Sequence, residues 1–160
     1  MRSAQVRLLI LACGNTLRSD DGVGPWLAEW AAQHFAAQPE IRVISRQQWT
    51  PDLAEDIANA DSVLFIDCSI ESAPGSIHLR PVEPATPEKG LATHHSGAAE
   101  LLALARDLYN SRHQESQLLT IGAGSIELGE VFSAPVRDAL PSACALLEKA
   151  VARFLTGSQP

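Results

Sequence analysis

Apolar residues along the chain fall into short continuous runs and into stripes with helical spacing. The runs at residues 8–12 and 62–66 contain few polar positions, which is typical of strands buried on both faces of a parallel sheet. Residues 41–44 predict a shorter strand, and residues 117–121 predict the last strand of the core.

The helical stripes alternate with these runs. Apolar residues from Val23 to Phe35 recur with helical spacing, and Pro25 suits the first turn of that helix. A second helix is expected over residues 52–60, with Thr50 as its N-cap and Pro51 as its first residue. The remaining helices are expected over residues 98–109 and over residues 134–155, where Pro141 predicts a bend or a restart.

One stretch differs from the others in its pattern. Residues 76–82 alternate between apolar and polar side chains, with Pro81 near the end, which predicts an edge strand buried on one face only. Residues 83–93 contain two prolines and a glycine and predict a loop.

The order of the elements predicts an α/β fold in a single three-layer domain over residues 1–160. We expect a mostly parallel twisted sheet of about five strands, one antiparallel edge strand, helices on both faces, and a frayed tail at residues 156–160.

The segment between the first strand and the first helix combines glycines with two adjacent carboxylates. In an open α/β sheet ligands bind beyond the carboxyl ends of the strands, so Asp20 and Asp21 are expected at the mouth of a site. A carboxylate there could simply cap the helix. A second one adds like-charge repulsion, which a nearby cation or proton would relieve. Both interpretations stay open at this level.

Composition narrows the classes of function. The formal net charge is −7 over 160 residues, without a cluster of Lys and Arg, which argues against a nucleic-acid partner. The apolar stretch near the N-terminus is too short for a signal peptide, and no segment approaches the length of a membrane span. We therefore expect a cytoplasmic protein.

The three cysteines do not indicate a disulfide framework. Cys13, Cys68 and Cys144 are odd in number and far apart, and none forms a C-x-x-C pair. Buried small side chains are the simplest interpretation. Cys13 and Cys68 lie at predicted strand ends, where a cysteine–histidine nucleophile is conceivable although the spacing does not favour it.

Two carboxylates and an imidazole are expected at one edge of the sheet. Asp21 follows the first strand, Asp67 ends the third, and His94 closes the long loop before the next helix. Such a set leaves an open position and suits a borderline divalent metal. Asp67 as a loop residue and His94 as a surface residue are the alternatives, and His95 competes with His94. A triad using Ser96 is less favoured, because Ser96 suits the N-cap of the following helix.

Several other chemistries lack their motifs. The chain has no G-x-S-x-G elbow, no Walker A sequence, no G-x-G-x-x-G fingerprint and no H-E-x-x-H.

The opening motif resembles that of a known family. The stretch Gly14-Asn15-x-Leu17-x-x-Asp20-Asp21-Gly22-x-Gly24 is similar to the start of the hydrogenase maturation endopeptidases, which trim the C-terminus of the large subunit of nickel–iron hydrogenases. The resemblance continues at Asp67, which closes a strand, and at His94 before a helix of small residues. It extends to the last strand, loop and helix (residues 121–129, Pro135 and Val136), so it spans nearly the whole chain in order.

This resemblance implies an activity and a site. Asp21, Asp67 and His94 would be both the catalytic residues and a metal-binding trio that recognises nickel already inserted in the hydrogenase precursor. The nickel would be supplied by the substrate, with Cd or Zn as substitutes in vitro, and no permanent cofactor is expected. The implied partner is the large-subunit precursor. We expect the chain to be a monomer that binds neither nucleic acid nor a membrane.

The chain departs from the family at three positions. Ala12 replaces a common glycine, Asp21 replaces a common glutamate, and Cys68 stands where a small residue such as alanine is common. A non-cleaving metal-sensing or chaperone-like module for hydrogenase assembly is the alternative function. A small-molecule hydrolase with one aspartate as general base is a third.

Overall fold

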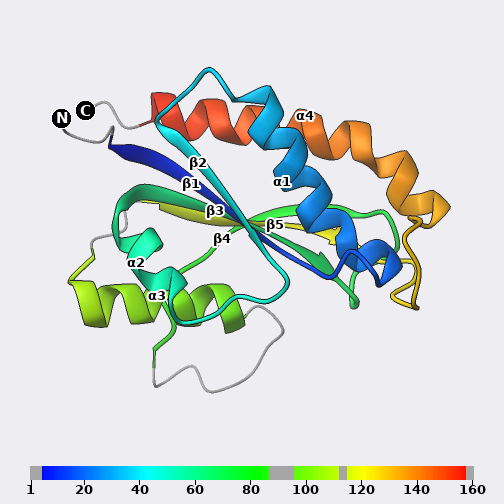
Figure 1. The fold of residues 1–160 in the computed structure, drawn as a ribbon, viewed down its shortest axis with the longest axis horizontal. Helices are drawn as coiled ribbons and strands as arrows, with labels where there is room; N and C mark the ends of the chain where they lie inside the picture. The colour runs from blue at the N-terminus through cyan, green and yellow to red at the C-terminus, as the bar shows by residue number, and fades with distance from the viewer. Residues whose placement is uncertain (1–4, 87–95, 112–114, 158–160) are drawn as a thin grey trace.

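Five strands lie side by side in the order β2-β1-β3-β5-β4 (Figure 1). The computed structural model describes residues 5–86, 96–111 and 115–157. All neighbouring strands are parallel except β4, which pairs antiparallel with β5. The predicted α/β sheet with one antiparallel edge strand is therefore confirmed. The strands are β1 (Val6–Cys13), β2 (Ile41–Arg46), β3 (Ala60–Ser69), β4 (Ile77–Pro81) and β5 (Glu115–Gly122).

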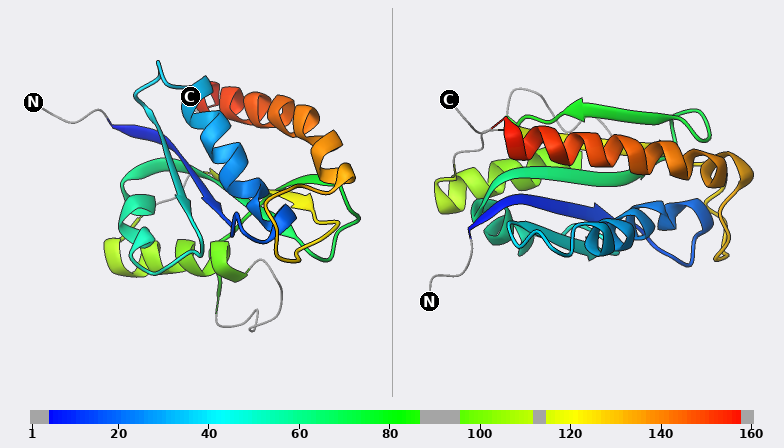
Figure 2. Two further views of the ribbon diagram at one scale, coloured as in Figure 1. Left: turned by 45° about the vertical axis from the view of Figure 1, so that its right-hand side comes forward. Right: turned by 90° about the horizontal axis from the view of Figure 1, so that it is seen from above.

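Helices cover both faces of this sheet (Figure 2). On one face, α1 (Val23–His34) and α4 (Ala134–Thr156) pack against alternate residues of β1 and β3 such as Ile10 and Ile66. On the other face, α2 (Leu53–Ala58) and α3 (Ser96–Tyr109) pack against the intervening residues, such as Leu11 and Phe65. Burial of β1 and β3 on both faces explains their continuous apolar runs.

Several element boundaries differ from the sequence-based expectation by a few residues. The second helix begins at Leu53 rather than Asp52, because the chain first makes a turn in which the Leu53 N–H donates to the carbonyl of Thr50. The Thr50 hydroxyl donates to the Asp52 carboxylate, so the predicted N-cap is wrong. Strand β3 starts at Ala60, two residues earlier than its apolar run.

The last helix continues through Pro141 without a restart. Pro141 and Arg137 are both exposed, so water can reach the Arg137 carbonyl that loses its helical partner.

Within the described residues, no helix combines the length and the apolar character needed to cross a bilayer.

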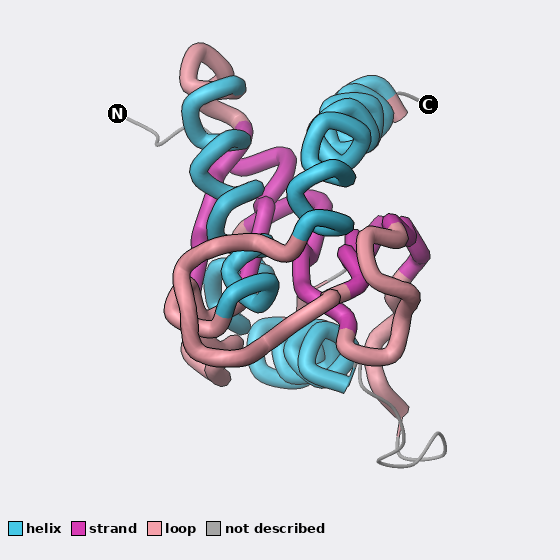
Figure 3. Tube along the Cα trace, turned by 90° about the vertical axis from the view of Figure 1, so that its right-hand side faces the viewer, coloured by secondary structure: helices cyan, strands magenta, loops and turns pink. Residues whose placement is uncertain are grey.

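The carboxyl ends of β1, β3 and β5 meet at one edge of the sheet, which we call the rim. Figure 3 looks onto this edge, where the loops after the strands gather. The connections from β1 and from β2 pass over opposite faces, through α1 and α2, so the strand order reverses between β1 and β3. This is the position at which open α/β sheets bind ligands.

Candidate active site at the rim

The loop after β1, residues 14–22, folds back on itself through Asp21. The Asp21 carboxylate accepts a hydrogen bond of 2.7 Å from the backbone N–H of Asn15. Gly14 lies so close to this turn that a Cβ there would stand 2.0 Å from the Asp21 carbonyl oxygen, at a φ of +154°. Only glycine fits this close approach, which explains the Gly-Asn pair of the motif.

A second glycine seats the first helix against the end of β1. A Cβ at Gly24 would lie 2.4 Å from the carbonyl oxygen of Cys13. The short 3-10 helix η1 (Ser19–Gly22) and the first turn of α1 can therefore sit directly on the strand end. This contact fixes Asp21 at the switch point between β1 and β3.

Asp20 is fully buried and binds the loop that follows β5, residues 123–133. Its carboxylate accepts hydrogen bonds from the N–H groups of Gly124 and Ser125, at 2.7 and 2.9 Å, and from the N–H and hydroxyl of Ser133, both at 2.7 Å. Burial alone would raise its pKa, but these hydrogen bonds outweigh burial and hold the pKa of Asp20 below its usual range. Asp20 is thus neither a helix cap nor free to meet a ligand.

The two loops are joined further by backbone hydrogen bonds. Ser19 N–H donates to the Gly129 carbonyl at 2.8 Å, and Gly129 N–H donates to the Leu17 carbonyl at 2.9 Å. The Ser19 hydroxyl also donates to the carbonyl of Glu127 at 2.8 Å. Residues 14–22 and 123–133 therefore form one connected surface beside the strand ends.

Asp67 lies at the end of β3, next to Cys13 at the end of β1. Its carboxylate accepts hydrogen bonds from the Cys68 N–H, at 2.7 Å, and from the Cys13 thiol. Burial, together with a smaller contribution from the negative charge of Asp21, raises the pKa of Asp67 to about 6 against the lowering effect of these hydrogen bonds. The structure thus brings Asp21 and Asp67 within electrostatic range of each other.

The neighbouring thiols are unsuited to nucleophilic attack. Burial raises the pKa of Cys13 far above its usual range, and the Asp67 carboxylate raises it further. Burial also raises the pKa of Cys68 to about 12. All three cysteines are free. Because the thiolate is the reactive form, a cysteine nucleophile at this rim is disfavoured at neutral pH.

The third member of the predicted trio cannot be placed. His94 and its rival His95 lie outside the described residues, as does most of the predicted loop at residues 83–93. Within residues 5–86, 96–111 and 115–157, no group of three or more His, Cys, Asp and Glu side chains is arranged to hold a metal ion. The metal-binding trio of Asp21, Asp67 and His94 stays a prediction.

Comparison with known proteins identifies relatives of this fold. The hydrogenase 2 maturation protease of Escherichia coli K12 is 28% identical over 105 residues, which cover 63% of this chain and 64% of that protein. The hydrogenase maturating endopeptidase HybD of E. coli superposes with a TM-score of 0.73 at 20% identity, covering 92% of this chain and 93% of that one. The maturation protease HybD of Thermococcus kodakarensis gives 0.63 at 26% identity, covering 90% and 98%. The resemblance to the hydrogenase maturation endopeptidases is confirmed.

These relatives of the maturation endopeptidase family are, by their names, hydrolases. No protein-family model matches the chain. The matched region spans less than two thirds of the curated maturation protease, while the shared fold covers nearly all of each solved endopeptidase chain.

Sequence reasoning missed part of the surface beside Asp21 in this endopeptidase fold. A pocket of about 310 Å³ opens between the start of α1 and the loop after β5. The spacing of Trp26 indicated only a core-facing helix position, and Glu130 and Phe132 lie in a loop without periodicity. The available signal was the presence of apolar residues scattered through that loop, among them the exposed Leu128 and Val131.

Proposed function

We propose that this chain is an endopeptidase that removes the C-terminal extension of a nickel–iron hydrogenase large-subunit precursor. It would recognise the inserted nickel through Asp21, Asp67 and His94. The observation that carries the proposal is the pairing of Asp21 and Asp67 at the switch point of a sheet similar to that of the maturation endopeptidases.

The electrostatics of this pair favour a cation. Asp67 is partly desolvated and feels the negative charge of Asp21, so its ionised form is costly in the absence of a positive charge. A divalent ion between the two carboxylates would offset both the repulsion and the desolvation. Oxygen and imidazole ligands suit borderline divalent metals such as nickel.

The position of α3 supports His94 as the third ligand. This helix begins at Ser96, and a Cβ on the next residue, Gly97, would lie 3.1 Å from the ring of Trp49. Trp49 follows β2 and packs on Phe65 of β3, with ring centroids 5.2 Å apart. The start of α3, which follows His94 in the sequence, is therefore packed beside the strand end of β2.

In this proposal the metal ion that assists peptide hydrolysis belongs to the precursor. Nickel in the precursor supplies Lewis-acid chemistry toward a peptide carbonyl or a water molecule. Asp21, Asp67 and His94 would hold the precursor by that ion against the rim. The anchored loop after β1 and the end of β3 keep the two carboxylates in fixed positions.

Exposed apolar side chains around the rim suit a protein substrate. Leu17, Leu128 and Val131 belong to the two connected loops, and their side chains are 56%, 81% and 79% exposed. Apolar residues gathered on a protein surface often mark an interaction site.

We further propose that the chain acts as a monomer in the cytoplasm.

The test is to incubate the purified chain with nickel-loaded precursor and to follow the precursor by intact-mass spectrometry. We expect the wild type to release one defined C-terminal peptide. The Asp21→Asn, Asp67→Asn and His94→Ala variants should release none, and Asp138→Asn, an exposed position on α4, serves as the matched control. Undiminished release by the first three variants would refute the proposed site. Stable binding of the precursor without a change in mass would instead favour the non-cleaving module.

A further inference from the structure

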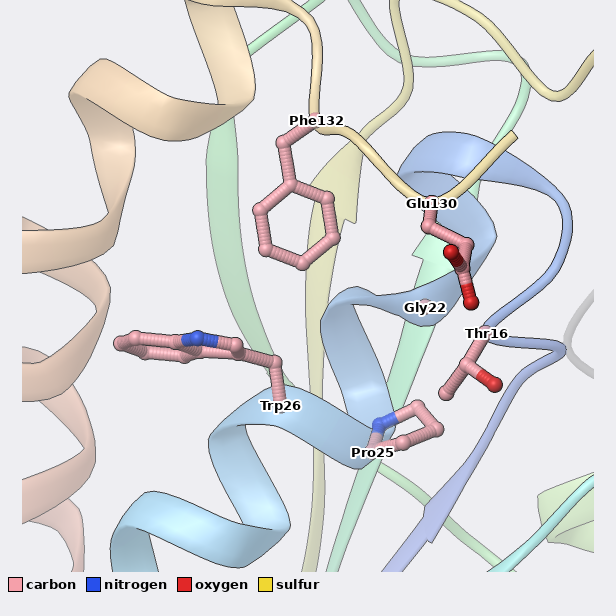
Figure 4. Close-up of a pocket in the computed structure, with 6 residues that line it drawn as sticks. All are labelled: Thr16, Gly22, Pro25, Trp26, Glu130 and Phe132. Atoms are coloured by element: carbon pink, nitrogen blue, oxygen red, sulfur yellow. The ribbon is translucent and has the colours of Figure 1, made fainter.

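The pocket beside Asp21 combines an apolar end with a charged end (Figure 4). The rings of Trp26 and Phe132 lie at one end, the carboxylate of Glu130 and the hydroxyl of Thr16 lie at the other, and Gly22 lies between them. Pro25 completes the lining. Three different segments thus contribute, and the connection between the two loops holds them together.

The apolar wall is fixed to the core. Phe132 is partly buried and packs on the cluster under α1 and α4, while Trp26, in the second position after Gly24, is 39% exposed. A Cβ at Gly22 would stand 3.1 Å from the Thr16 Cα and 3.7 Å from the Phe132 ring. The absence of a side chain at Gly22 therefore leaves room between the two ends of the pocket.

The charged end offers an exposed carboxylate, that of Glu130. No ion pair or hydrogen bond within the described part of the chain involves the Glu130 carboxylate. A pocket with aromatic rings at one end and a carboxylate at the other fits a long side chain that carries a positive charge. Its methylene stem would lie along the rings, and its charge would interact with the carboxylate.

We propose that this pocket binds a lysine or arginine side chain of the hydrogenase precursor segment that runs past the rim. The proposal rests on the proposed function, because it names a subsite of the same active site. Gly22 lines the pocket and directly follows Asp21, so the bound side chain would belong to the stretch of precursor next to the nickel.

The surroundings of the pocket favour a peptide over a small free cation. A second hollow of about 340 Å³ lies on the other side of Thr16 and Pro25, which line both spaces. Gly14, Asn15 and Arg46 contribute to this second hollow. The two spaces are therefore adjacent along the loop after β1, as an extended peptide with side chains in both would require.

Processing kinetics test the subsite in the context of the reaction. Glu130→Gln keeps the shape of the side chain and removes its charge, and we expect kcat/KM for the nickel-loaded precursor to fall about fivefold to tenfold. Glu127→Gln is the matched control, since Glu127 is an exposed carboxylate in the same loop that does not line the pocket. Replacing the lysines and arginines near the cleaved bond by glutamate, one at a time, should identify one position. Glu130→Lys should restore processing of that precursor variant.

A binding measurement separates this proposal from the proposed function. The indole N–H signal of Trp26, assigned with Trp26→Phe, is followed by NMR during titration with N-acetyl-arginine amide. The signal should shift in the wild type, shift much less with N-acetyl-norleucine amide, and be unresponsive in Glu130→Gln. If the wild type processes precursor but Glu130→Gln and Glu127→Gln behave alike, the subsite is refuted and the function stands. If no precursor is processed, the titration alone decides the subsite, and an equal response of wild type and Glu130→Gln refutes it.

Discussion

Ser133 donates two hydrogen bonds of 2.7 Å to Asp20, from its backbone N–H to Oδ1 and from its hydroxyl to Oδ2. Ser133 directly precedes α4, and Asp20 lies in η1 directly before α1. One buried carboxylate therefore ties together the starts of the two helices that cover the same face of the sheet. The neighbouring Asp21 lies on a backbone that this contact holds in place.

Asp20→Asn should destabilise the protein by about 3 kcal/mol, because an amide NH₂ would face N–H and O–H donors in a buried position. Urea unfolding at pH 7 measures this free energy. The folded pKa of Asp20 is lower than its unfolded value near 3.8, so its stabilising contribution is present above that pH and is lost as pH falls through the folded pKa. The difference between wild type and variant should therefore narrow below about pH 4. A gap of constant size from pH 7 to pH 3 would contradict the role assigned to this carboxylate.

Asp21→Asn should have little effect on the stability of the protein, in contrast to Asp20→Asn. Within the described residues its carboxylate accepts one hydrogen bond, from the Asn15 N–H, and an amide oxygen can accept the same bond. We expect a change in unfolding free energy below about 1 kcal/mol together with loss of precursor processing. Large destabilisation by Asp21→Asn would show that the two aspartates share a structural role.

Asp67→Asn should raise the stability of the protein at neutral pH. The folded pKa of about 6 exceeds the unfolded value of 3.8, so ionisation of Asp67 opposes folding as pH rises through this range. We expect Asp67→Asn to gain on the order of 2 kcal/mol at pH 7.5, and to lose this advantage between pH 6 and pH 4. Thermal or urea unfolding at several pH values gives the curve. An equal or lower stability of the variant at pH 7.5 would contradict the proposed cost of this buried charge.

Gly24→Ala should destabilise the start of α1. The added Cβ would meet the Cys13 carbonyl oxygen at 2.4 Å, and neither the strand nor the buried first turn has room to move away. We expect a loss of at least about 2 kcal/mol. Ala32→Gly, at an exposed position of the same helix, provides the comparison and should cost about 1 kcal/mol. The close contact would be disproved by a Gly24→Ala protein as stable as wild type.

The thiols should be slow to react. Burial raises the pKa values of Cys13, Cys68 and Cys144, so each is almost entirely protonated at pH 8. Iodoacetamide labelling followed by peptide mass spectrometry should be much slower in the folded protein than in guanidinium chloride. Rapid labelling of Cys13 in the folded state would reopen the cysteine–nucleophile hypothesis.

The sheet could be predicted from the sequence because β1 and β3 are buried on both faces, which leaves continuous apolar runs such as residues 8–12. The edge strand β4 could be predicted because only one of its faces is covered and because it ends at Pro81. The start of β3 could not be predicted, since Asp61 is polar and Ala60 suits the end of the preceding helix equally well.

The site was only partly predictable. Strand ends point to Asp21 and Asp67, because their place follows from the sheet alone. Nothing in the sequence separates Asp20 from Asp21, since their different roles depend on Ser133, which is 113 residues away. The Glu130 pocket likewise depends on how the loop after β5 folds onto the loop after β1.

The sheet order has a consequence for synthesis of the protein on the ribosome. β4 is translated before β5, yet in the described sheet it pairs with β5 alone. The partners of Asp20 are translated later still. A nascent chain that ends before β5 therefore leaves β4 unpaired, and one that ends before residue 133 lacks a partner of Asp20. The rim therefore cannot be completed until the loop after β5 has emerged from the exit tunnel.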